Sequence, residues 1–127
     1  MVILRKIKSV RKVWRKKENE YITITEDFFD GFQFQKGKYI AYASIINCNP
    51  RFLEPKTFQF FYKKPLADAI YTIAHELLHF IFFDFIKKKL KKKQNIYQKI
   101  SCGTFQRYLM WLCLNLRDIA VSLIKNL

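Results

Sequence analysis

Residues 65–89 hold the stretch that decides the fold, PLADAIYTIAHELLHFIFFDFIKKK. The stretch is largely apolar, contains no glycine, and has proline only at its first position, where a helix tolerates it. Asp68 follows in the first turn, where a carboxylate interacts favourably with the helix dipole. Five ionisable side chains between Pro65 and Ile86 argue against a membrane span. We therefore predict a long, buried helix over about residues 65–89.

This helix carries the only two histidines of the chain, His75 and His79, with Glu76 directly after the first. At a spacing of four the two imidazoles project from one face and can bind one zinc ion at about 2.0–2.1 Å. Glu76 lies about 100° round the helix, where a carboxylate can act as general base on a zinc-activated water. The pattern predicts a zinc-dependent hydrolase. The alternative is a buried helix whose histidines only satisfy hydrogen bonds in the core.

A catalytic zinc site usually has three protein ligands and one open position. Asp84 follows His75 by nine residues, which places it about 180° away on the helix, so it can bind the metal only if the helix breaks, and we discount it. The candidates further along the chain are Asp118, Cys102 and Cys113. Asp118 lies in an apolar helical stretch, residues 109–123, where a carboxylate is costly unless it is paired or metal-bound. We predict Asp118 as the third ligand, with an ion pair as the alternative.

The N-terminal third of the chain gives local signals. Apolar residues at spacings of four, three and four predict a helix over about residues 3–18; they are Ile3, Ile7, Val10 and Trp14. Residues 21–25, YITIT, are typical of a strand. Asp30-Gly31 is a turn dipeptide between two phenylalanine-rich segments, which suggests a β-hairpin.

The remaining segments complete an α+β layout. Residues 38–47 and 57–62 predict strands on either side of a loop bounded by Pro50 and Pro55. A final helix is expected over about residues 104–125, after Gly103. We predict a single domain, residues 1–127, in which the helices pack against a small, mostly antiparallel sheet of about three to four strands.

The chain is strongly basic, with a formal net charge of +14. Eight basic residues lie within residues 1–17, and six lysines lie within residues 87–93. Such clusters attract nucleic acid or an anionic membrane surface, or they form solvated helix faces.

Cysteine content and the N-terminus bear on location. The three cysteines form no CxxC pair, which fits a reducing compartment. The first seventeen residues have no uninterrupted apolar segment of the kind found in a signal peptide. We expect a cytoplasmic protein.

Residues 74–84, AHELLHFIFFD, followed by Leu116-Arg117-Asp118-Ile119-Ala120, resemble the minigluzincins, minimal zinc peptidases of the gluzincin clan. The resemblance covers about residues 57–125. It implies a short sheet, an active-site helix with His75 and His79 as ligands and Glu76 as general base/acid, and a second helix with the third ligand. It also implies that the strand over residues 57–62 binds an extended peptide substrate at the upper rim of the cleft.

One position departs from the family pattern. The minigluzincins supply a glutamate from the second helix, whereas this chain offers Asp118, whose side chain is one methylene shorter. The expected function is therefore a zinc metallopeptidase. The alternatives are a catalytically weak or inactive binding protein on the same scaffold, and a basic module that associates with nucleic acid or a membrane surface.

Overall fold

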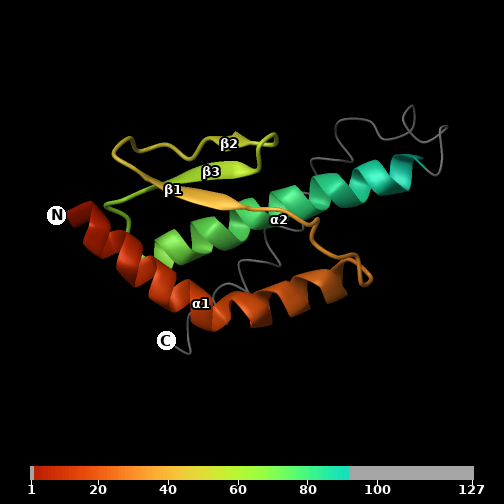
Figure 1. Cartoon of the computed structure of the whole chain (residues 1–127), viewed down its shortest axis with the longest axis horizontal. Helices are drawn as coiled ribbons and strands as arrows, with labels where there is room; N and C mark the ends of the chain where they lie inside the picture. The colour runs from red at the N-terminus through yellow and green to blue at the C-terminus, as the bar shows by residue number, and fades with distance from the viewer. Residues whose placement is uncertain (1, 92–127) are drawn as a thin grey trace.

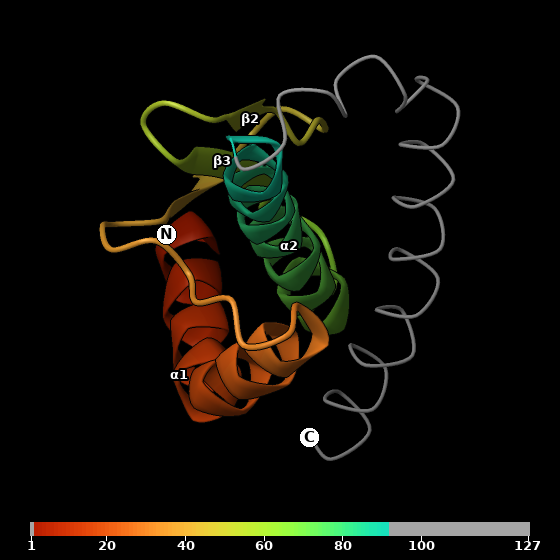
Figure 2. The same ribbon diagram turned by 90° about the vertical axis from the view of Figure 1, so that its right-hand side faces the viewer.

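The computed structural model describes residues 2–91 of the chain. Its elements, in order, are α1 (Val2–Phe28), β1 (Ile40–Ser44), β2 (Arg51–Phe52), β3 (Thr57–Phe61) and α2 (Leu66–Lys91). Within these residues the fold is α+β, with two helices and one small mixed sheet (Figure 1). The sheet covers one side of α2, and α1 lies against another side (Figure 2). The helix predicted over residues 104–125 lies outside the described residues.

α1 extends ten residues beyond the predicted C-terminal end of the helix, so the strand predicted over residues 21–25 is wrong. Tyr21 and Thr25 are one helical turn apart, and both are buried. The Tyr21 hydroxyl donates a hydrogen bond to the Ala74 carbonyl of α2, and the Thr25 hydroxyl donates to the Tyr21 carbonyl. Because these tertiary contacts need one helical face, packing outweighs the local β propensity of this segment.

The hairpin predicted at Asp30-Gly31 is also wrong, because this dipeptide ends α1. The Gly31 amide donates to the Glu26 carbonyl at 2.8 Å, and the Asp30 amide donates to the Asp27 carbonyl at 3.1 Å. Asp30 has φ +55° and Gly31 has φ +79°. This is a Schellman cap, which requires the same left-handed conformation as a hairpin turn, so the dipeptide alone does not distinguish the two.

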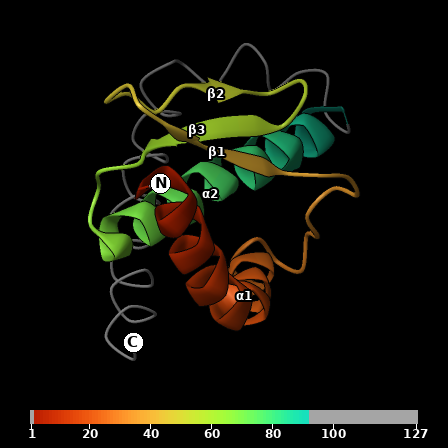
Figure 3. The ribbon, with the colours of Figure 1, turned by 60° about the vertical axis from the view of Figure 1, so that its left-hand side comes forward.

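The sheet has the strand order β1-β3-β2 (Figure 3). β1 pairs in parallel with β3 over five residues, and the two-residue β2 pairs antiparallel with β3. The strands predicted over residues 38–47 and 57–62 are confirmed as β1 and β3. The expectation of a mostly antiparallel sheet is wrong, since the longer pairing is parallel. β2 lies in the segment predicted as a loop between Pro50 and Pro55.

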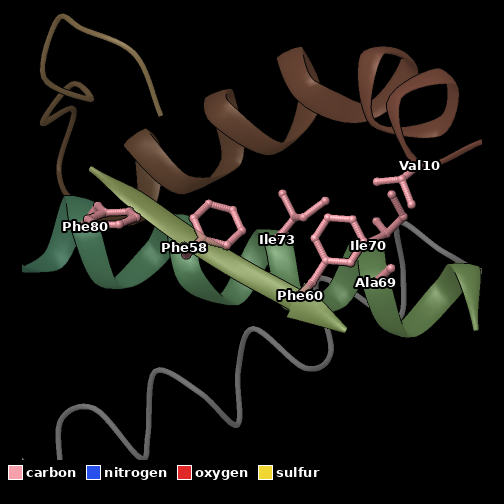
Figure 4. Packing of buried hydrophobic residues seen from close by; sticks show 7 residues of the cluster. All are labelled: Val10, Phe58, Phe60, Ala69, Ile70, Ile73 and Phe80. Carbon is pink, nitrogen blue, oxygen red and sulfur yellow. The ribbon is translucent and has the colours of Figure 1, made fainter. Parts of the chain in front are cut away.

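The predicted long helix is confirmed as α2, which supplies much of the core. Phe58 and Phe60 alternate on the face of β3 that contacts this helix, and both are buried. The main cluster (Figure 4) comprises Val10, Phe58, Phe60, Ala69, Ile70, Ile73 and Phe80. It joins the first half of α1, the sheet and α2. A second cluster packs Phe29, at the end of α1, against the second half of α2.

α2 is also long and apolar enough to cross a membrane by length and composition alone. Its segment Leu66–Lys88 reaches a mean hydropathy of 1.4. However, 61% of that segment is buried inside the fold. The helix therefore occupies the position of a core helix among the described residues.

Candidate metal centre

The two histidines of α2 bring their Nε2 atoms together. His75 Nε2 and His79 Nε2 are 3.0 Å apart, and the two rings are close to perpendicular. Two zinc–nitrogen bonds of about 2.1 Å at a tetrahedral angle need a separation of about 3.4 Å. A shift of a few tenths of an ångström would therefore let both nitrogens bind one ion. The predicted pairing of the two side chains on one helical face is present.

The surroundings keep both imidazoles uncharged near neutral pH. Burial, followed by the charges of Arg51 and His75, lowers the pKa of His79 from 6.5 to about 4. Burial also lowers the pKa of His75, with Glu76 and Arg51 acting in opposite directions. Metal binding requires a neutral imidazole, so both side chains are ready to act as ligands.

The second ring nitrogen of His79, Nδ1, is buried. It has no hydrogen-bond partner among the residues that the structure describes. A ligating histidine normally donates its second N–H to a carboxylate or carbonyl, which fixes the ring. Residues 2–91 do not supply that acceptor for His79.

Glu76, the predicted general base, is buried beside the histidines and forms an ion pair. Arg51 Nη1 donates to Glu76 Oε2 at 2.8 Å, and the two side chains are 28% and 8% exposed. Arg51 belongs to β2, where it lies opposite Phe58 of β3. Directly opposed residues in a sheet project to the same face, so Arg51 points with Phe58 toward α2. The register of β2 therefore delivers a guanidinium to the HExxH motif.

A cavity of about 340 Å³ adjoins these residues. It is lined by Asn49, Lys64, Asp68, Tyr71, Thr72, His75 and Glu76. Asp68, Tyr71 and Thr72 lie seven, four and three residues before His75, which places them on the histidine face of α2. The Tyr71 ring stacks on His75 with centroids 6.0 Å apart. The cavity thus provides space for a ligand next to the candidate metal site.

A larger cavity of about 730 Å³ lies between α1, β1 and α2. It is lined mainly by apolar side chains, including Trp14, Ile73 and Leu77, and by neither histidine nor Glu76. We place the candidate site at the smaller cavity, because His75 and Glu76 line it.

The predicted third ligand lies outside the residues that the structure describes. Asp118, Cys102 and Cys113 are not among the described residues, which contain no cluster of three or more potential ligands. α2 continues without a break past Asp84, whose carboxylate forms an ion pair with Lys56, before β3. Cys48 is a free and exposed thiol. Residues 2–91 therefore supply two candidate ligands and a candidate base.

The strand predicted as the upper rim is β3, which pairs with β2 only at Thr57 and Phe58. β3 lies in the centre of the sheet, paired with β1 along its whole length. The edge strand beside the site is β2, whose Arg51 contacts Glu76.

Two groups of residues at the site were missed from the sequence. Tyr71 and Thr72 could have been found, because their spacing to His75 is that of one helical face. Arg51 and Lys64 gave no such signal, since each reaches the site through sheet register or a turn.

Comparison with models of protein families, with curated proteins and with solved structures gave no match.

Proposed function

We propose that the protein is a zinc-dependent peptidase of the minigluzincin type. The observation that carries the proposal is the approach of His75 Nε2 and His79 Nε2 to 3.0 Å beside the buried carboxylate of Glu76. In this proposal His75, His79 and Asp118 hold the zinc ion. The ion, when bound, supplies a Lewis acid for the scissile carbonyl group and for water. The protein acts in the cytoplasm on peptides or proteins bound in an extended conformation.

Glu76 carries the proton in this reaction. A carboxylate has two oxygens, so the ion pair between Glu76 Oε2 and Arg51 leaves Oε1 to accept a proton from the attacking water. Glu76 then returns that proton to the leaving amine as the peptide bond breaks. Arg51 holds the carboxylate in place through this ion pair.

Cleavage of a peptide mixture by the zinc-loaded protein tests this function. A proteome-derived peptide mixture covers many sequences, and mass spectrometry identifies new termini. The wild type should produce new termini, and Glu76→Gln should produce none while it retains zinc. Glu54→Gln, at an exposed carboxylate in the turn after β2, is the matched control and should cleave like the wild type. Equal cleavage by wild type and Glu76→Gln would refute the assignment of the base.

A binding protein without turnover is the second candidate. The ion pair between Arg51 and Glu76 favours it, because a guanidinium occupies one oxygen of the base. In this case the protein binds zinc and peptides, yet Glu76→Gln changes neither property and no new termini appear.

α1 favours an additional association with a polyanion. Five of its cations lie on the solvent-exposed face, opposite the buried Val10 and Tyr21: Arg5, Lys8, Lys12, Arg15 and Lys16. Among the described residues, one ion pair involves α1, between Lys17 and Glu20. Retention on DNA or on anionic vesicles that falls steeply with salt would support a basic module.

A further inference from the structure

We propose that the cavity beside Glu76 binds a carboxylate group of the substrate and that Lys64 is its specificity-determining residue. The inference rests on the proposed peptidase function and adds a substrate class. The ligand is a peptide with a carboxylate close to the cleaved bond, either on an acidic side chain or at the C-terminus.

The position of the Lys64 ammonium is the first observation. Lys64 Nζ donates to Thr72 Oγ1 at 3.2 Å. It also donates to the side-chain oxygen of Asn49 at 3.1 Å, in the amide orientation that satisfies both ends of Asn49. Thr72 is in turn fixed, because its hydroxyl donates to the Asp68 carbonyl at 2.9 Å. Two neutral acceptors therefore hold the ammonium in one place.

The charge of Lys64 is not balanced within the described residues. The ion pairs found there involve Lys17, Arg51 and Lys56, and none involves Lys64. An ammonium has three N–H groups, so two neutral partners leave one N–H for a ligand. A half-buried cation with only neutral partners binds an anion more strongly than a fully solvated surface lysine does.

Neighbouring groups add to this positive potential. The Lys6 ammonium donates to the Lys64 carbonyl at 2.7 Å, which brings a second cation close to the cavity. Lys64 also lies two residues before α2, whose first turn presents unpaired amide groups and the positive end of the helix dipole.

Asp68 is the opposing charge that the cavity contains. Its side chain is exposed in the first turn of α2 and forms no ion pair within the described residues. Water screens an exposed carboxylate more effectively than it screens the half-buried Lys64. Asp68 therefore reduces the preference for a carboxylate without reversing it.

The volume of the cavity sets the size of the ligand. About 340 Å³ accommodates one amino-acid residue, and His75 and Glu76 form part of the wall. A residue bound there has its peptide bond next to the candidate base. The carboxylate that Lys64 recognises therefore belongs to a residue that flanks the cleaved bond.

Matched peptides test this inference in two assays. One pair of short, capped peptides differs only in glutamate against glutamine, and a second pair differs only in a free C-terminal carboxylate against an amide. Binding is measured by calorimetry on the metal-free full chain, and cleavage by mass spectrometry on the zinc-loaded chain. The preference within each pair separates an acidic side chain from a C-terminal carboxylate as the source.

We expect a preference of about tenfold for the carboxylate in one of the two pairs, the size typical of a charge-assisted hydrogen bond. Lys64→Met should abolish it, and Lys63→Met, at the exposed neighbouring lysine, should preserve it. Asp68→Asn should increase it.

No preference, or a preference that survives in Lys64→Met, would overturn the inference. A preference for the neutral member of either pair that Asp68→Asn abolishes would also overturn it, since Asp68 would then select the ligand. If the zinc-loaded wild type cleaves nothing while the metal-free chain still prefers the carboxylate through Lys64, the inference stands and the peptidase function fails.

Discussion

The ion pair between Arg51 and Glu76 gives a quantitative prediction for the stability of the metal-free protein. Arg51→Met keeps most of the apolar stem and removes the guanidinium. The substitution leaves the Glu76 carboxylate, 8% exposed, without the partner 2.8 Å away. Loss of one member of a fully buried pair costs about 3–5 kcal/mol. Because Arg51 is 28% exposed, we expect a loss of about 2–3 kcal/mol.

Glu76→Gln should cost less, about 1 kcal/mol, because the unpaired guanidinium can turn toward water. The double variant removes both charges and should be no less stable than Arg51→Met alone. The two single losses are thus non-additive by about 1–2 kcal/mol. Urea unfolding of the wild type, both single variants and the double variant, all in chelator at pH 7.5, gives this coupling energy. Additive losses, or an Arg51→Met variant as stable as the wild type, would refute the pair described here.

Three further predictions concern the same fold. The metal-free protein should lose on the order of 3 kcal/mol of stability as pH falls from 6.5 to about 4, because the unfolded chain protonates His79 at a higher pH than the folded chain does. The loss should level off below about pH 4 and should be smaller in His79→Gln. Urea unfolding at each pH measures it. Asp84→Asn should lower the free energy of unfolding by about 1–3 kcal/mol by removing the partner of Lys56, and it should leave the zinc content unchanged. Loss of zinc in this variant would place Asp84 at the metal site. Tyr21→Phe should lower the free energy of unfolding by about 1 kcal/mol through loss of the hydrogen bond to Ala74, and an unchanged value would contradict that contact.

The sequence predicted α2 well because several independent signals agree there. Pro65 fits the first turn, Asp68 fits the dipole, and the apolar run is longer than a strand. The spacing of His75 and His79 then follows from helical geometry alone. Consequently the part of the site that lies on one helix was predicted with its correct arrangement.

The sequence failed where long-range contacts decide. Residues 21–25 have β-branched side chains, yet they are helical because Tyr21 reaches α2 across 53 positions of sequence. Arg51 contacts Glu76 only through its register opposite Phe58, and no local pattern encodes that register. The site residues that come from separate elements could therefore be identified only once the fold was known.

Zinc content per chain tests the central proposal most directly. Native mass spectrometry of the wild type, His79→Gln and Asp118→Ala, prepared identically with zinc and then dialysed, gives the stoichiometry. The three-ligand account predicts about one tightly held zinc in the wild type and its loss in both variants. No retained zinc in a folded wild type, or full retention in His79→Gln, would contradict the account.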